Sequence, residues 1–168
     1  MTRTAAVVIG VILLATAGCA PTAQDMRPEV SYDYDVHADF TRMLRYKWLP
    51  APATSKLDPL NAKRIVSAVD RNLQSKGLKE DDNRPDFFIA MQTGTLRKMD
   101  TTSFGHDYGL YDEGKLNLAF FDAGTNAILW KGETRARIFP NLSPEEKDRL
   151  INEAVDSILS YFPPPPKN

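Results

Sequence analysis

The residues best suited to bind a metal ion lie close together in the first quarter of the chain. Three aspartates and one histidine alternate there, at Asp33, Asp35, His37 and Asp39. Carboxylate oxygens and imidazole nitrogens are common metal ligands, and on a strand Asp33, Asp35 and His37 would share one face. The chain has no second histidine cluster and no His-Glu-x-x-His or calcium-loop spacing. We therefore predict no metal site, but a solvated strand face that protects a sheet edge, with Asp39 as a turn cap.

Residue types used in nucleophilic catalysis occur together at Ser103, His106 and Asp107. Catalytic triads are rarely built from sequence neighbours, and no nucleophile-elbow motif surrounds Ser103. The glycines between positions 105 and 114 lack the Lys-Ser/Thr pair of a phosphate-binding loop. We predict a polar loop here, with no catalytic residues, no cofactor-binding residues and therefore no enzymatic activity.

Two further segments could bind a partner. Lys131, Arg135 and Arg137 would form a basic strip on one face of a strand. Phosphate head groups or an acidic partner could meet this strip, but such a strip is more often the solvated side of a hairpin. The prolines at 163–166 could be a polyproline ligand. The simpler interpretation is that they end a helix and begin a frayed tail.

The N-terminus has the three parts of a secretory signal peptide. Arg3 is the only charged residue before Asp25, residues 5–14 are almost wholly apolar, and small residues follow at 15–18. The apolar stretch is too short to span a bilayer about 30 Å thick. We therefore predict that residues 1–18 are removed on export.

The single cysteine of the chain follows that signal directly. Thr16-Ala17-Gly18-Cys19 resembles a bacterial lipobox, in which a peptidase cuts before the cysteine and acyl chains such as palmitate are added. Ala17 and Gly18 fit the motif, whereas Thr16 replaces the preferred leucine. We predict Cys19 as the lipid-attachment site, because two or more acyl chains hold a protein stably on a membrane. Ala20, in place of aspartate, favours the outer membrane by resemblance to Gram-negative sorting.

The rest of the chain divides into a tether, one domain and a tail. Residues 19–29 contain two prolines and no apolar periodicity, which indicates a tether. The ten residues after Cys19 reach at most about 35 Å, so the domain would stay near the membrane surface. We predict a single domain over residues 30–164 and a short tail over residues 165–168.

Alternating apolar residues predict five strands in the domain. They lie at 30–36, 44–48, 87–96, 116–120 and 128–138. Arg97 and Lys98 are expected to mark the exit of the third strand. Residues 99–114 contain three glycines and three aromatics and are expected to form a long irregular loop. The turn between the last two strands is expected at 122–126.

Two helices carry clear start and stop signals. Asp58 can cap the first, Pro59 fits its first position, and Gly77 follows its expected end. The second opens with a capping box, Ser143 to Glu146, and ends before the prolines. The apolar residues on each helix form one stripe, and those of the second are Leu150, Ile151, Ala154, Val155, Ile158, Leu159 and Phe162.

These elements predict an α+β fold. Both helices are apolar on one side, and so is the last hairpin, so each must bury one face. The economical arrangement is a two-layer sandwich: one mainly antiparallel sheet of four to five strands, with two helices packed on one face.

Several short motifs resemble a bacterial lipoprotein family known as domain of unknown function 4136. They occur in order at 31–40, 46–48, 77–78, 85–86, 111–114, 122, 130–132 and 162–164. Together they cover nearly all of the expected mature domain. The resemblance implies an exported, usually lipid-anchored α+β domain, and it implies neither an activity nor catalytic residues.

Composition narrows the function further. The 168 residues include 21 basic and 22 acidic side chains, which excludes a strongly basic nucleic-acid binder. We predict a non-enzymatic envelope protein, anchored in the membrane by its acylated N-terminus, that faces the periplasm and contacts an envelope protein partner. The alternative is a small-ligand or lipid-binding domain with residues 99–114 as a lid. A deep apolar pocket would favour the ligand, and a shallow surface with an exposed apolar patch would favour the partner.

Overall fold

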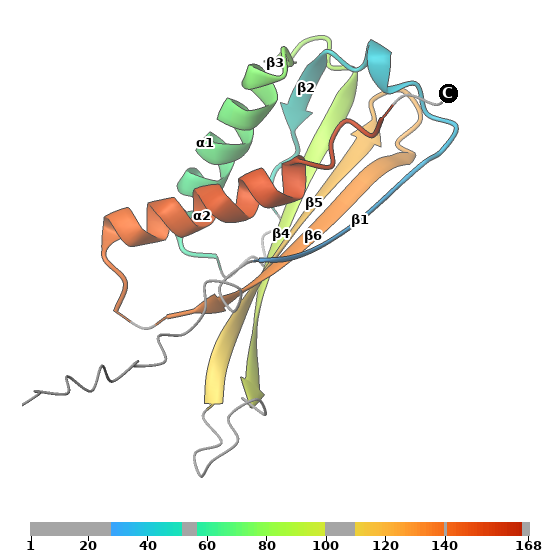
Figure 1. The fold of residues 1–168 in the computed structure, drawn as a ribbon. Helices are drawn as coiled ribbons and strands as arrows, with labels where there is room; N and C mark the ends of the chain where they lie inside the picture. Colours follow the sequence, from blue (N-terminus) through green and yellow to red (C-terminus); the bar gives the residue numbers. More distant parts are fainter. Residues whose placement is uncertain (1–27, 52–56, 100–109, 140, 166–168) are drawn as a thin grey trace, which may run out of the picture.

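One layer of the protein is a six-stranded mixed sheet. The computed structural model describes residues 28–51, 57–99, 110–139 and 141–165. The strands are β1 (Glu29–Tyr34), β2 (Arg45–Trp48), β3 (Lys79–Glu80), β4 (Phe87–Met99), β5 (Leu110–Asp122) and β6 (Ile128–Ile138). Their order across the sheet is β1-β6-β5-β4-β2-β3 (Figure 1). β1, β6, β5 and β4 are antiparallel neighbours, whereas β2 runs parallel to both β3 and β4.

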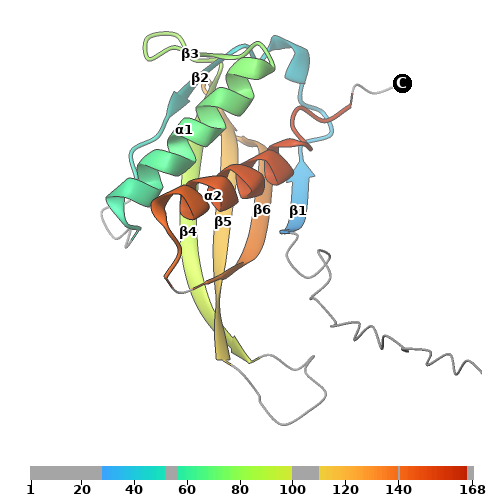
Figure 2. The same ribbon diagram turned by 60° about the vertical axis from the view of Figure 1, so that its left-hand side comes forward.

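The second layer consists of two helices that lie on the same side of the sheet (Figure 2). They are α1 (Pro59–Ser75) and α2 (Pro144–Leu159), and a short 3-10 helix, η1 (Phe40–Arg42), precedes β2. Side chains from both helices and from the central strands form one continuous hydrophobic core. The predicted α+β class, with two helices on a sheet, is therefore confirmed.

The helix ends match the predicted signals. The carboxylate of Asp58 accepts a hydrogen bond from the amide of Asn61, at 3.0 Å, and caps α1. At the other end Gly77 adopts φ +86°, which only glycine reaches without strain. The amide of Leu78 then donates to the carbonyl of Leu73, at 3.0 Å, and completes a glycine-terminated helix end.

The N-terminus of α2 has the predicted capping box. The amide of Glu146 donates to the hydroxyl of Ser143, and the amide of Ser143 donates to the carboxylate of Glu146. At the C-terminal end of α2, the ammonium of Lys76 donates to the carbonyls of Leu159 and Phe162. This lysine from the end of α1 therefore stabilises the end of α2, where the helix dipole is negative.

The most densely packed part of the core is aromatic. Five rings form it, and we call this region the aromatic end: Tyr46, Phe87, Phe120, Trp130 and Phe162. Phe162 lies at its centre, with ring centroids 4.6 Å from Phe120, 5.5 Å from Trp130 and 6.1 Å from Phe87. Such contacts between buried rings stabilise the region beyond the area they bury.

The structure corrects several details of the predicted sheet. It has six strands instead of four to five, and it is mixed instead of mainly antiparallel. The two-residue β3 and the parallel pairing of β2 with β3 and β4 were not predicted. β1 spans Glu29–Tyr34 and not 30–36. β4 continues through Arg97 and Lys98 to Met99, so these charges do not mark its exit. β5 already begins at Leu110, within the segment predicted to be irregular.

Candidate functional site

The cysteine predicted to carry the lipid, Cys19, lies outside the described residues, as do the signal peptide and nearly all of the tether. Ser103, His106 and Asp107 also lie outside them. Of the predicted lid at 99–114, residues 100–109 are outside the described part, and residues 110–114 belong to β5. The prediction of a loop lid over 99–114 is therefore wrong for residues 110–114, because they belong to β5 and pair with β4 and β6.

The acidic run does not lie on one strand. β1 ends at Tyr34, so Asp35 and His37 fall beyond it and cannot share a strand face with Asp33. The carboxylate of Asp33 lies on β1 and forms an ion pair with Lys131 of β6, at 3.3 Å. Asp33 is thus engaged with a neighbouring strand.

The remaining members of the run organise the turn that follows β1. The carboxylate of Asp35 accepts a hydrogen bond from the amide of His37, at 2.8 Å. The carboxylate of Asp39 accepts bonds from the hydroxyl and amide of Thr41, at 2.6 and 3.1 Å, and caps η1. The bond from the Thr41 hydroxyl lowers the pKa of Asp39 below its ordinary value. Asp39 is therefore the predicted turn cap.

The basic residues of β6 lie on the sheet face opposite the helices and interact with acidic or aromatic side chains there. Glu133 forms ion pairs with Arg135 and with Lys115, each at 2.6 Å. These contacts, with Lys115 first, lower the pKa of Glu133. The guanidinium of Arg137 lies 4.6 Å from the ring centroid of Tyr111. This pairing supports the interpretation of the strip as the polar side of the hairpin.

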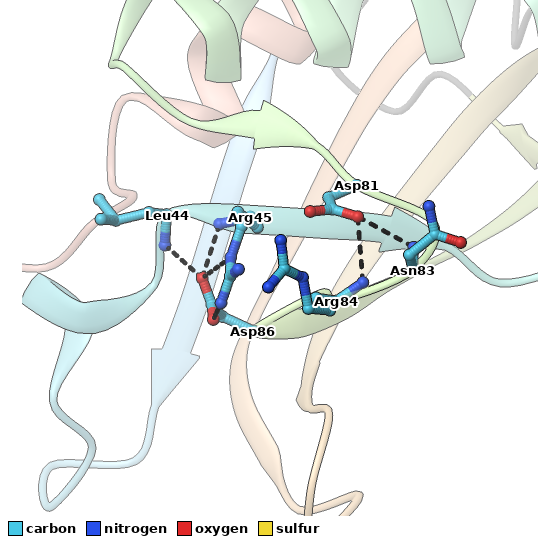
Figure 3. A network of polar contacts seen from close by, with 6 residues as sticks. All are labelled: Leu44, Arg45, Asp81, Asn83, Arg84 and Asp86. Atoms are coloured by element: carbon cyan, nitrogen blue, oxygen red, sulfur yellow. Dashed lines mark hydrogen bonds and ion pairs between the residues drawn. The ribbon is translucent and has the colours of Figure 1, made fainter.

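A second polar network joins β2 to β4 (Figure 3). One carboxylate oxygen of Asp86 accepts hydrogen bonds from the amides of Leu44 and Arg45, at 3.1 and 2.9 Å. The guanidinium of Arg45 donates to the same carboxylate, with a shortest contact of 2.7 Å. The bond from Arg45 is the largest cause that lowers the pKa of Asp86. Asp86 thus holds the start of β2 beside the start of β4 and has a structural role.

The feature best suited to bind a molecule is a cavity between the sheet and the N-terminal halves of the two helices. Its volume is about 730 Å³, within the range typical of small-molecule sites. Its main apolar lining comes from Ile65 of α1, Met91 and Leu116 of the sheet, and Leu150 and Ile151 of α2. We call this part of the molecule the cavity end.

The cavity has a buried inner wall and an exposed rim. On the inner wall, Ile65, Leu116 and Thr134 are at least nine-tenths buried. The rim includes Asp58 and Lys147, from the first turns of the two helices. A molecule could therefore enter past the helix N-termini and contact the sheet.

The cavity exists because small side chains occupy the sheet where it lies. On the helix-facing side, Ile89, Phe120 and Trp130 are register neighbours at the aromatic end. Farther along the same three strands, the corresponding neighbours are Thr95, Gly114 and Ala136. The sequence contained the signal for the cavity in this decrease of side-chain volume, but the register was needed to align the small residues across the strands.

The described residues contain no other clear chemical site. Within the ranges given above, no three histidine, cysteine or acidic side chains are arranged to hold a metal ion. None of the helices in the same part of the chain is both long and apolar enough to cross a membrane.

Comparison with known proteins identifies the domain and its fold. The family profile "Domain of unknown function (DUF4136)" matches residues 30–164, and no curated protein matches the sequence. A PDZ domain protein from Parabacteroides distasonis has a similar fold, with a TM-score of 0.54 and 14% identity. The match covers 85% of this chain but 38% of that protein, so the chain spans well under half of its length.

PelC from Paraburkholderia phytofirmans, described as a dodecamer, has the same fold over almost its whole length. A variant of PelC gives a TM-score of 0.53 and 12% identity, and the match covers 79% of this chain and 95% of that one. A second crystal form gives a TM-score of 0.50, with 9% identity and the same coverage. At these identities the likeness concerns the fold alone.

Proposed function

The chain belongs to the family of domain of unknown function 4136, and from that premise we propose that it is an exported, lipid-anchored envelope protein whose domain binds a small apolar ligand. The cavity between sheet and helices is the observation that carries the binding part of the proposal. It is concave and mostly apolar, and its inner wall contains buried side chains such as Ile65 and Leu116, as expected of a ligand-binding domain and not of a flat surface that docks a protein partner.

The anchoring part rests on the sequence before the domain. A signal-like segment ends in small residues, and the only cysteine follows at Cys19. An acylated Cys19 would hold the domain at the membrane through the tether at 19–29, and Ala20 favours the outer membrane with the domain facing the periplasm. Cys19→Ala is expected to abolish acyl labelling and to release the protein from membranes. An unchanged membrane fraction would contradict the anchor.

We also propose that the domain binds its ligand without catalysing a reaction, and that it does not bind nucleic acid. Asp39 caps a helix, Asp86 clamps two strands, and Glu133 pairs with two cations, so each of these carboxylates has a structural task. The formal net charge of −1 gives little attraction for a phosphate backbone.

The ligand-binding proposal can be tested with residues 20–168, a chain that retains every residue that the structure describes. N-phenyl-1-naphthylamine, an apolar probe that becomes fluorescent in dry environments, is expected to bind it. Ala154 lines the cavity, so Ala154→Phe should fill the space and abolish the fluorescence. Glu153→Phe places the same ring on the exposed side of α2 and serves as the matched control.

Either of two results would overturn the proposal. Either the natural sequence fails to bind the probe, or Ala154→Phe binds it as well as Glu153→Phe does. Melting curves by circular dichroism show whether both variants are folded. If Ala154→Phe does not fold, Ala136→Leu fills the cavity from the sheet side and replaces it in the comparison.

A second candidate function, an interaction module, is favoured by the position of β1 at one edge of the sheet. Among the described strands β1 pairs only with β6, and the exposed ring of Tyr32 stacks on Tyr161 with centroids 4.3 Å apart. An edge strand of this kind can add a strand from another chain. PelC, which has a comparable fold, is described as a dodecamer. Light scattering tests self-association: a monomer would contradict it, and an assembly dispersed by Tyr32→Lys would support it.

A further inference from the structure

The paired ends of β4 and β5 extend beyond the rest of the sheet (Figures 1 and 2). We call this part the arm and define it as residues 96–99 of β4 and 110–113 of β5, which pair one to one in the antiparallel register. β6 ends at Ile138, the register partner of Asp112. Leu110 and Tyr111 therefore lie past the last described pair between β5 and β6.

The arm exposes large apolar side chains. Leu96, Met99 and Leu110 are 54%, 57% and 63% exposed. Met99 and Leu110 are register partners, and Leu110 is two residues from Asp112, so all three share the helix-facing side of the sheet with Ile138. Ile138 is itself exposed and lines the cavity. An exposed apolar strip thus continues the cavity wall to the end of the arm, and such strips mark interaction surfaces.

The acidic groups of the arm are neutralised by cations on the neighbouring strand. Arg97 pairs with Asp112 at 3.2 Å, and Lys98 pairs with Glu113 at 2.8 Å. A charged group that approaches an apolar environment is less costly when an opposite charge lies beside it. These pairs therefore lower the cost of bringing the arm to a surface that excludes water.

The face of the arm that points away from the helices carries two aromatic rings around one cation. The guanidinium of Arg137 lies 4.6 Å from the ring centroid of Tyr111 and 5.8 Å from that of Phe139. Tyrosine and arginine combine an apolar body with a polar tip, and tyrosine is enriched at the boundary between membrane and water. Both faces of the arm therefore present side chains suited to that boundary.

The tether joins the domain at the same end as the arm. β1 begins at Glu29 and runs toward the aromatic end. Through the register of β6 and β5, Glu29 is level with Gly94 of β4, and Met99 lies five residues farther along that strand. This distance is about 17 Å at about 3.3 Å per residue. The ten residues after Cys19 reach at most about 35 Å, so the tether allows the arm to touch a membrane that holds Cys19.

We propose that the arm is a membrane-contact surface: its apolar side chains lie between the lipid head groups and the acyl chains, and they hold the opening of the cavity toward the bilayer. This inference rests on the proposed function as a lipid-anchored binding domain. Because apolar molecules leave water for the bilayer, the contact places the cavity where its ligand is concentrated.

A fluorophore on a single residue tests the contact. Residues 20–168 contain no cysteine, so one introduced cysteine can carry nitrobenzoxadiazole, whose emission rises and shifts to the blue when it leaves water. Met99→Cys places it on the arm, and Leu44→Cys places it at the aromatic end on a side chain that is also 58% exposed. An N-terminal histidine tag, in place of an acylated Cys19, holds each protein on vesicles of phosphatidylethanolamine, phosphatidylglycerol and nickel-chelating lipid.

We expect the label at residue 99 to shift to the blue on these vesicles and to be quenched by lipids with brominated acyl chains. The label at residue 44 should do neither. An unchanged spectrum at residue 99, or equal changes at both residues, would overturn the proposal. A blue shift at residue 99 that brominated chains do not quench would show that a second copy of the domain covers the arm, and would overturn it too.

One isoleucine at each end of β6 provides a matched pair of substitutions. In the Met99→Cys protein, Ile138→Asn should lower the ratio of domains with the arm on the membrane to domains without contact by about 3- to 10-fold, because a buried apolar side chain is lost from the contact. Ile128→Asn removes the same exposed side chain at the aromatic end and should leave the ratio unchanged. Equal ratios in the two variants would contradict the role of the strip, and circular dichroism shows whether both are folded.

The outcome is separable from the proposed function. Because the tag replaces the lipid, a label at residue 99 that stays in water refutes the arm contact but leaves the acylation of Cys19 and the binding of N-phenyl-1-naphthylamine as they were measured. Conversely, if Cys19→Ala keeps its membrane fraction, the anchor fails whatever the label reports.

Discussion

The aromatic end and the cavity end are built from the same strands and helices but are filled differently. At the aromatic end, Phe120, Trp130 and Phe162 are at least 98% buried and lie within ring contact of one another. At the cavity end, small and β-branched side chains on β4, β5 and β6 leave about 730 Å³ unfilled. Protein interiors normally pack as densely as organic crystals, so the contrast shows that side-chain volume, and not backbone arrangement, determines where this fold holds a cavity.

The contrast also assigns different tasks to the two ends. Burial of large apolar side chains is the main source of folding free energy, and these side chains are concentrated at the aromatic end. The cavity end contributes less and can therefore tolerate substitutions that change its shape. Mutations at the two ends should differ in their effect on the free energy of unfolding, which two pairs of substitutions test: Phe162 against Leu150, and Gly132 against Gly94. Two further predictions concern α2 as a whole and the clamp at Asp86.

The largest effect is expected when the chain ends at Leu142. This removes α2 together with Phe162, and with them Val155 and Ile158, which are fully buried. Apolar side chains of this size each contribute about 1.5–3 kcal/mol when buried, and typical net stability is about 5–15 kcal/mol. The shortened chain should therefore show no cooperative thermal transition by circular dichroism.

A chain that ends at Pro164 is the control for this truncation and should melt like the full domain, because it retains the whole core. A cooperative, native-like melt for the chain that ends at Leu142 would contradict the architecture. In that case α2 would be an appendage and not one layer of the sandwich.

The second comparison truncates one large side chain at each end. Phe162→Ala should lower the free energy of unfolding by about 3–5 kcal/mol, because the ring is almost fully buried among other rings. Leu150→Ala, at the cavity end, should cost about 1 kcal/mol, because Leu150 is half-buried and already borders empty space. Urea denaturation measures both, and equal losses would show that the two ends do not differ in their contribution.

The helices and their packing could be predicted from the sequence for clear physical reasons. Asp58 and Gly77 satisfy the free backbone groups at the ends of α1, and Ser143 with Glu146 does so for α2. These are local interactions, and local sequence determines them. β3 could not be predicted, because two residues show no periodicity and their pairing depends on distant β2.

The candidate site was less predictable than the fold. The sequence directed attention to Asp33, Asp35 and Asp39, whose carboxylates are instead occupied by an ion pair or by turns. Thr134 carried no signal at all, since a threonine within an alternating strand is ordinary. Its burial depends on the register of β1, β6 and β5, which only the folded structure reveals.

The third comparison adds one methyl group at each end. A Cβ at Gly132 would collide with the indole of Trp130 and approach the side chain of Ile158 to 2.7 Å. Gly132→Ala should therefore cost about 1–3 kcal/mol through overpacking. A Cβ at Gly94 of β4, which is level with the cavity but pairs with Lys115 and so points to the sheet face away from the helices, would meet nothing within 4 Å. Gly94→Ala should be neutral or stabilise the strand by up to about 1 kcal/mol. Thermal melts that rank the two variants in the opposite order would contradict the close packing around Gly132 and the open space around Gly94.

The smallest effect is expected at Asp86, the polar clamp at the start of β4. The hydrogen bonds from Arg45 and Leu44 lower the pKa of Asp86 in the folded state. A carboxylate with a lowered pKa stabilises the fold above its unfolded pKa of about 4, and this stabilisation is lost as the pH falls through the folded value. The pair is partly exposed, so solvent weakens it.

Asp86→Asn should accordingly lower the melting temperature at neutral pH. The difference in melting temperature between the variant and the natural sequence should disappear as the pH falls below about 4. Asp82→Asn is the matched control, because it removes the same charge from an exposed pair with Lys47 whose shortest contact is 3.6 Å. It should change little at either pH. A gap for Asp86→Asn that stays constant down to acidic pH would mean that hydrogen-bond geometry, and not the charge of the carboxylate, holds β2 beside β4.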